Sequence, residues 1–224
     1  MTSDSILKLD HINLTLTGAA GAVHILKDVS LSLPSGKTVS VVGPSGSGKT
    51  TLLMILGGLE KPSNGMVTVA GAELNGMTED ELAAFRRDNI GIIFQSFHLI
   101  PTMTALENVA IPLEFAGDKK AFAKAGEALS AVGLSERVGH YPGQLSGGEQ
   151  QRVAIARAFV TAPRLILADE PTGNLDVDTG KKVMDMLFEL TRKNGTTLLL
   201  VTHDPALAAR CDITIKIRDG KITP

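Results

Sequence analysis

This 224-residue chain has a single cysteine and no long apolar run, and each absence excludes a class of protein. Cys211 has no second cysteine to pair with, which excludes the disulfide-stapled class of small secreted domains. No apolar stretch approaches the roughly 20 residues that cross a bilayer. The first residues show neither the basic start nor the apolar core of a signal peptide. We therefore expect a cytoplasmic protein, and another chain must supply any membrane-spanning part.

An excess of charge of one sign is also missing. The chain has 22 Lys and Arg against 24 Asp and Glu, a formal net charge of −2 at pH 7. Domains that bind nucleic acid usually carry a basic excess gathered on one face, so we expect no nucleic-acid partner. A hydrophobic content of 43% over this length suits one well-buried core.

A glycine-rich segment follows the apolar stretch at 38–42, which we expect to be a buried strand. Glycine lets the backbone approach phosphate groups closely, and a helix beginning near the lysine adds the partial positive charge of its N-terminus. The lysine would reach the β- and γ-phosphates, and the threonine hydroxyl would bind Mg²⁺. A turn without a ligand is the alternative, which the flanking apolar segments disfavour. This phosphate loop consists of Gly43, Pro44, Ser45, Gly46, Ser47, Gly48, Lys49 and Thr50.

Two acids end the apolar run at 165–168. Such a run is typical of a buried parallel strand, and open α/β sheets bind ligands at the carboxyl ends of these strands. Asp169 is the expected partner of Mg²⁺, through water. Glu170 is placed to act as general base toward the attacking water. Two solvated acids would be the plainer interpretation of this segment alone, and the phosphate loop argues against it.

Two further polar residues follow apolar runs that we expect to be strands. Gln95 comes after the run at 90–94, and His203 follows the run at 197–201. Either residue alone would be interpreted as a surface residue. Their order along the chain and their places at strand ends make both candidates for the nucleotide site.

A second motif, Leu-Ser-Gly-Gly-Glu-Gln at Leu145–Gln150, lies well downstream of the phosphate loop. The two motifs in this order resemble the ATP-binding cassette (ABC) family of ATPases. The family's usual fifth letter, Gln, comes one position late here, behind Glu149, a variant that the transporter branch also uses. The turn at Pro171–Asp176 resembles the D-loop of the family, which crosses the dimer interface.

The resemblance covers essentially the whole chain and implies a Mg²⁺-dependent ATPase that forms a homodimer around two ATP. In the family, the signature of one subunit closes over ATP held by the phosphate loop of the other. Gln95 would contact Mg²⁺ and the water, and His203 the γ-phosphate. The implied catalytic residues are Lys49, Gln95, Glu170 and His203, the metal ligands are Thr50, Gln95 and Asp169, and the ATP contacts outside the phosphate loop are Thr51, Ser146, Gly147, Gly148, Glu149 and Asp176.

The expected fold is α/β, with a RecA-like parallel-sheet core, an N-terminal antiparallel β part and an inserted helical subdomain. Alternating residues from 6 to 33, around a turn at 18–21, predict antiparallel strands, and 66–70 predicts another. We expect one nucleotide-binding domain over 1–224, with the core at 1–95 and 163–224 and the helical subdomain at 96–162. Helices are predicted at 78–88 (with a capping box from Thr78 to Glu81), 105–116, 119–132, 146–162 and 180–193.

The segment Phe94–Pro101 and the following Thr104–Val109 resemble the lipoprotein-releasing and macrolide-exporter ATPases. In that branch the ATPase drives an integral-membrane permease with large periplasmic domains. We therefore expect the ATP-hydrolysing subunit of a bacterial inner-membrane ABC transporter, peripheral on the inner face of that membrane. A regulatory, non-transporting ATPase of the cell-division type is the alternative. ATPases of DNA repair or translation are disfavoured, because the chain has neither a long coiled-coil insertion nor a second cassette.

One departure from the family concerns the nucleotide base. The family usually stacks adenine on an aromatic residue near the N-terminus, and counting back from Ile25–Val29 places that position at Leu16. No aromatic residue occurs between Leu7 and Leu33. Because base–aromatic stacking contributes about 1–3 kcal/mol in nucleic-acid binding, we expect weaker nucleotide affinity and base selectivity than is usual.

Four apolar residues cluster in the short segment after Gln95, namely Phe97, Leu99, Ile100 and Met103. A loop of an isolated protein would favour polar residues there, and exposed apolar clusters mark interaction sites. We therefore expect this segment to dock the permease. The alternative is that these residues close the core of the helical subdomain.

Overall fold

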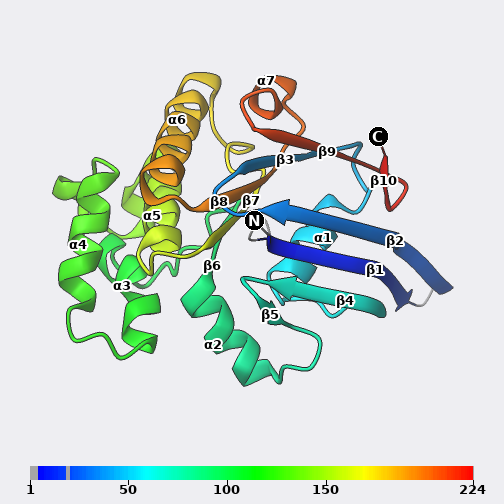
Figure 1. Cartoon of the computed structure of the whole chain (residues 1–224). Coiled ribbons are helices and arrows are strands. Elements are labelled where there is room, and N and C mark those ends of the chain that lie inside the picture. The colour runs from blue at the N-terminus through cyan, green and yellow to red at the C-terminus, as the bar shows by residue number, and fades with distance from the viewer. Residues whose placement is uncertain (1–4, 19–20, 224) are drawn as a thin grey trace. The chain divides into compact units, whose positions relative to one another are not determined.

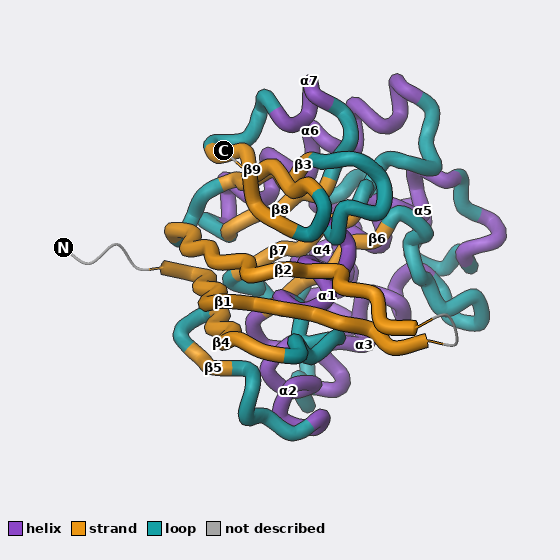
Figure 2. Tube along the Cα trace, turned by 90° about the vertical axis from the view of Figure 1, so that its right-hand side faces the viewer, coloured by secondary structure: helices purple, strands orange, loops and turns teal. Residues whose placement is uncertain are grey.

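Two long antiparallel strands open the chain in the computed structural model, which describes residues 5–18 and 21–223. Strand β1 (Ser5–Gly18) pairs with β2 (Gly21–Pro34) on one side and with β4 (Asn64–Val69) on the other, and β4 pairs with β5 (Ala72–Glu73). Figure 2 shows these strands side by side. The predicted antiparallel part is confirmed. Residues 1–4, used for the signal-peptide expectation, and residues 19 and 20 of the turn lie outside the described residues.

A parallel arrangement surrounds strand β3 (Thr38–Val42), which lies between β8 (Thr197–Val201) and β9 (Ile213–Arg218). Strand β10 (Lys221–Thr223) adds to β9 antiparallel. Strand β8 is buried along its whole length, as expected for a parallel strand in the middle of a fold. Helix α1 (Lys49–Leu56) follows β3 after the phosphate loop, and α7 (Pro205–Ala208) follows β8.

Helices dominate the next part of the chain. Strands β6 (Ile90–Phe94) and β7 (Leu165–Asp169) pair in parallel. Helices α3 (Ala105–Phe115) and α4 (Ala121–Ala131) pack on each other and on α5 (Gly147–Phe159), as Figure 1 shows. Helix α5 also lies against β6, so closely at Gly91 that a Cβ there would overlap the carbonyl oxygen of Ala158. Helix α6 (Val177–Asn194) completes this set.

Contacts divide the chain into two units, one of residues up to Arg86 with those from Thr196 onward, and one of Arg87–Gly195. The second unit therefore contains β6, β7 and α6 together with the helical segment. Helix α2 (Glu79–Asn89) runs across the boundary in sequence. The predicted division with a helical subdomain at 96–162 stays a prediction.

Most predicted elements are present with small shifts at their ends. The predicted capping box of α2 forms, with Glu81 accepting from the backbone N–H and the hydroxyl of Thr78. Helix α5 ends at Phe159 and not at 162, since Ala162 has a left-handed backbone and Pro163 follows. Helix α6 begins at Val177, before the predicted start at 180, because Asp176 caps it. In the described ranges 5–18 and 21–223, no helix has the length and apolar character needed to cross a membrane.

Candidate functional site

The phosphate loop connects β3 to α1, as its sequence predicts. Gly48 caps the helix with φ of 102°, a left-handed conformation that glycine adopts without strain. A Cβ at Gly48 would also lie 2.8 Å from Cδ2 of Leu26 on β2. The loop therefore needs glycine here both for its turn and for its close packing on the antiparallel strands.

Two side chains of the loop fit a phosphate ligand. The ammonium of Lys49, only 9% exposed, donates to the carbonyl oxygens of Gly43 and Pro44 at 2.9 Å each. The hydroxyl of Ser47 is buried and has no hydrogen-bond partner among the described residues. Buried polar atoms without partners are rare in folded proteins. An anion at the start of α1 would give both groups a partner of suitable chemistry.

His203 lies at the same sheet edge as the phosphate loop. Strands β3 and β8 are parallel neighbours in a register that pairs Val41 with Val201. The N–H of Thr202 continues this pairing by donating to the carbonyl oxygen of Val41 at 3.2 Å. The exposed His203 comes next, so the first unit brings together two of the predicted elements, the phosphate loop and the histidine.

The second unit brings Gln95 and Glu170 to adjacent strand ends. Strands β6 and β7 are in a register that pairs Phe94 with Asp169, and the two candidates follow directly. Glu170 has a positive φ of 43°, which is uncommon for a residue other than glycine. Such conformations cost on the order of 1–3 kcal/mol and cluster at functional sites. This turn orients the carboxylate that we expect to act as general base.

A reciprocal amide pair joins Gln95 to the turn after Glu170. Gln95 donates through Nε2 to Oδ1 of Asn174, and Asn174 donates through Nδ2 to the carbonyl oxygen of Gln95, both at 3.1 Å. Sequence analysis assigned no role to Asn174. Its position within the D-loop-like turn was the only indication, since the two residues are distant in sequence. The pair gives Gln95 a fixed starting position.

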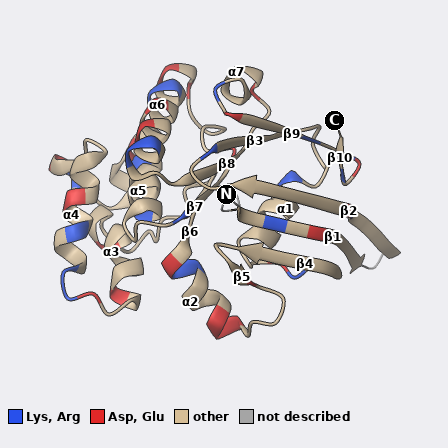
Figure 3. Ribbon diagram, in the orientation of Figure 1, with Lys and Arg blue, Asp and Glu red and all other residues tan. Residues whose placement is uncertain are grey.

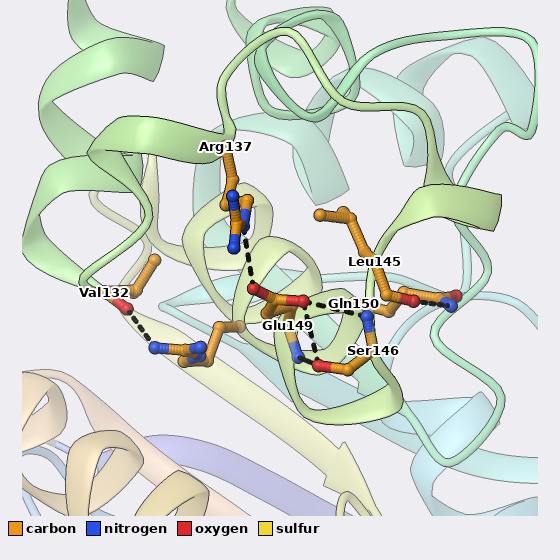
Figure 4. A network of polar contacts seen from close by, with 7 residues as sticks. Val132, Arg137, Leu145, Ser146, Glu149 and Gln150 are labelled. Atoms are coloured by element: carbon orange, nitrogen blue, oxygen red, sulfur yellow. Dashed lines mark hydrogen bonds and ion pairs between the residues drawn. The ribbon is translucent and has the colours of Figure 1, made fainter.

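The signature segment caps helix α5, as Figure 4 shows. Glu149 accepts from the backbone N–H and the hydroxyl of Ser146, both at 2.9 Å, and from Nε of Arg137 at 3.0 Å. The hydrogen bond from the Ser146 backbone, followed by that from Arg137, lowers the pKa of Glu149 to about 2. The carboxylate thus stays ionised and holds the motif in shape. A direct contact of Glu149 with ATP stays a prediction.

The glycines of the signature lie against the start of α6. A Cβ on Gly148 would overlap Cγ2 of Thr179, and one on Gly147 would lie 3.3 Å from Cδ2 of Leu175. Asp176 accepts from the backbone N–H of Thr179 at 3.0 Å, which lowers the pKa of its carboxyl group. The signature and the D-loop-like turn are therefore packed as one piece.

Comparison with known proteins decides the family. The sequence profile of the ABC transporter family matches residues 26–173. The chain belongs to the ABC transporter family. It is 46% identical over 224 residues to the uncharacterized ABC transporter ATP-binding protein YbbA of Escherichia coli K12, covering 99% of this chain and 98% of YbbA. The lipoprotein-releasing system ATP-binding protein LolD of Bordetella pertussis is 46% identical over 220 residues, 97% of this chain and 95% of LolD.

Solved structures agree with this assignment. A dimeric structure of the ATP-binding cassette MJ0796, in a post-hydrolysis state bound to ADP and Pi, matches with a TM-score of 0.89 and 42% identity over 97% of each chain. The predicted fold, the ATPase activity and the branch with lipoprotein-releasing ATPases are confirmed. This ABC protein is an ATP-binding, ATP-hydrolysing subunit. The roles of its individual residues remain predictions.

Proposed function

We propose that two copies of this ABC ATPase close over two ATP and thereby drive an integral-membrane permease with large periplasmic domains. The observation that carries the proposal is the state of the phosphate loop, in which the Ser47 hydroxyl is buried without a described partner. The capped signature helix supports it, because the first amides of a helix have no intrahelical acceptor and suit a γ-phosphate.

The chain's own residues would divide the chemistry as follows. Lys49 would bind the β- and γ-phosphates, and Glu170 would take a proton from the attacking water while His203 donates to the γ-phosphate. Thr50, Gln95 and Asp169 would hold Mg²⁺, which when bound neutralises charge on the phosphate oxygens. The Ser146–Gly148 segment of the second copy would close over the same γ-phosphate.

The proposed place of action is the inner face of the bacterial plasma membrane, where the permease would hold the subunit. The printed name of LolD refers to lipoprotein release, and its similarity to this chain along nearly the full length favours lipoprotein or lipid handling. The permease contact is the part of the proposal that this chain's structure bears on most directly, through the segment after Gln95.

The proposed docking segment, residues 97–104, is held through its backbone. Asn108, fully buried on α3, accepts from the N–H of Ile100 at 2.8 Å and donates to the carbonyl oxygens of Ile100, Met103 and Thr104 at 3.0–3.1 Å. Ile100 remains 38% exposed, while Leu99 and Met103 are half-buried. A rigid backbone that presents apolar side chains suits a docking surface, because little conformational entropy is lost on binding.

Replacing Phe97 and Met103 together with serine tests the docking. We expect the ATPase rate of the isolated subunit to persist, while co-purification with the permease is lost because the apolar contact is removed. The matched control replaces Phe115 and Phe122 with serine, two apolar residues that are exposed on α3 and α4. Normal permease binding by a folded Phe97/Met103 variant would place the contact elsewhere.

Leu16→Tyr tests how the base is held. Leu16 and its cross-strand partner Val23 are 46% and 55% exposed on the β1–β2 pair, so they offer apolar contact without a ring. We expect the tyrosine to tighten ATP binding by up to about 1–3 kcal/mol, measured by calorimetry. We also expect GTP to compete with ATP better in the unaltered protein than in the variant. Leu59→Tyr, at a position 45% exposed, is the control. An unchanged dissociation constant for Leu16→Tyr would show either that Leu16 is not at the stacking position or that another group holds adenine.

A further inference from the structure

An arginine on α5, the helix that begins with the signature segment, forms hydrogen bonds with the backbone at the start of the docking segment. Arg157 of α5 donates from Nη1 to the carbonyl oxygen of His98 at 2.7 Å and from Nη2 to that of Phe97 at 2.9 Å. These are the short distances expected when a charged donor forms the hydrogen bond. The planar guanidinium presents two donors side by side, so it can hold two successive carbonyl oxygens at once.

The two residues that Arg157 holds have an unfavourable backbone. Phe97 and His98 have φ of 54° and 50°, in the left-handed region that residues with a Cβ rarely adopt, and two in a row are rarer still. The rings of Phe94 and His98 stack with centroids 4.8 Å apart, which helps to fix the turn. Conformations of this kind persist only where the surrounding structure imposes them. The hydrogen bonds of Arg157 are part of that constraint.

The partial burial of the guanidinium makes these hydrogen bonds necessary. Arg157 is partly buried, and the loss of solvation lowers its pKa. A partly buried cation needs strong acceptors, and the carbonyl oxygens of Phe97 and His98 supply them. The turn and the arginine therefore depend on each other.

Helix α5 connects these hydrogen bonds of Arg157 to the signature segment. Arg157 lies ten positions after Gly147 on the same helix, about 15 Å along its axis at the usual rise per residue. The close approach of Ala158 to Gly91 keeps this end of α5 packed on β6, the strand that leads into the docking segment. A shift of the N-terminus of α5 would thus reach the carbonyl oxygens of Phe97 and His98 through one rigid element.

We propose that Arg157 is a positioning residue that couples the signature helix to the docking segment 97–104, in addition to any link through Gln95. The inference rests on the proposed function for its consequence at the permease. The coupling itself is a property of the second unit of the chain. Closure of the signature over ATP would move α5, and Arg157 would carry that movement to the backbone at which the permease docks.

Hydrogen exchange on the isolated subunit tests the coupling without the permease. In a Glu170→Gln background, which should retain ATP, we expect ATP to slow amide exchange across residues 97–100. Arg157→Lys keeps the charge but loses the planar guanidinium, whose two donors are aligned with the two successive carbonyl oxygens. Because the turn opens more easily when one of these hydrogen bonds is lost, we expect amide exchange there to be roughly tenfold faster, and to be the same with and without ATP. ATP-dependent dimerisation should persist.

A second substitution distinguishes two roles of Arg157, namely stabilising the turn at Phe97 and His98 and transmitting the movement of α5. Because Arg157 helps to hold the left-handed turn, we expect Arg157→Lys to lose co-purification with the permease. Glycine adopts the left-handed conformation freely, so His98→Gly added to Arg157→Lys should restore co-purification but not the ATP response of the exchange. The matched control adds Ala162→Gly, which relieves another left-handed residue (φ 52°) that Arg157 does not hold. This control should restore neither property.

Two results would overturn the proposal. One is an ATP response across 97–100 that persists undiminished in Arg157→Lys. The other is loss of ATP-dependent dimerisation in both Arg157→Lys and Arg157→Gln, which would show that the residue only supports the fold. If the exchange results hold while the Phe97/Met103 variant still binds the permease, the coupling stands and the docking site fails.

Discussion

Glu170→Gln should lower ATP turnover by about 10²–10⁴-fold, the usual contribution of a general base, while ATP should still bind. The amide has nearly the same shape as the carboxylate but no negative charge, so it cannot take the proton of the attacking water. Because Gln has nearly the same size and shape as Glu, we expect the turn with its positive φ at this position to be kept. Steady-state phosphate release and ATP retention on a filter measure the two effects.

Two further variants and removal of Mg²⁺ serve as controls for the Glu170→Gln experiment. Glu189→Gln makes the same chemical change on an exposed position of α6 and should leave turnover unchanged. Lys49→Ala should weaken ATP binding itself, and chelation of Mg²⁺ should abolish turnover in the unaltered protein. Near-normal turnover in Glu170→Gln would remove Glu170 from the role of base.

Gly148→Ala should lower ATPase activity by at least about tenfold, since small misplacements of catalytic groups can cost factors of this size or more. The added Cβ would overlap Cγ2 of Thr179, a short side chain that cannot move far. The start of α5 must therefore shift relative to α6, and the signature amides shift with it. ATPase assays at saturating ATP measure the loss.

A second substitution at Thr179 tests whether the loss of activity comes from this overlap. Thr179→Ser removes the methyl group in question and keeps the backbone N–H that Asp176 accepts, so it should restore activity to Gly148→Ala. Gly143→Ala is the control, because a Cβ there would meet nothing within 4 Å. Failure of Thr179→Ser to rescue would mean that Gly148 acts through something other than this packing.

The parts of the site that could be predicted from the sequence are those whose residues are neighbours along the chain. A strand, a glycine-rich turn and a helix start follow each other around Lys49, and an apolar run leads directly into Asp169 and Glu170. Local periodicity and turn chemistry are enough for such segments. The capping box of Ser146 and Glu149 follows the same four-residue pattern as Thr78 and Glu81, so the sequence contains the signal for it.

The remaining features depend on contacts between distant segments. Asn174 meets Gln95, and Arg157 meets Phe97 and His98, across separations of about 60 to 80 residues. Residue type alone does not predict the left-handed conformations of Phe97 and His98, because Phe rarely adopts them and His, although enriched among such residues, does so only uncommonly. No pattern of neighbouring residues could reveal them.

The distribution of charged residues over the helices and strands also depends on the fold. The near-zero net charge came from composition alone, and Figure 3 shows how the two signs are distributed along individual elements. On α6, acidic residues (Asp178, Asp185 and Glu189) are interspersed with two pairs of basic residues (Lys181 with Lys182, and Arg192 with Lys193). Composition predicts the balance, while only the fold shows which elements carry both signs.

The most direct test of the account is the mass of Glu170→Gln in solution, measured by multi-angle light scattering with and without ATP. The single chain has a mass of 23.5 kDa. The account predicts that saturating ATP and Mg²⁺ shift the protein to twice that mass, and that Ser146→Arg, which places a bulky side chain at the signature, prevents the shift. A protein that stays at the mass of one chain at saturating ATP would contradict the claim that two copies close over the nucleotide.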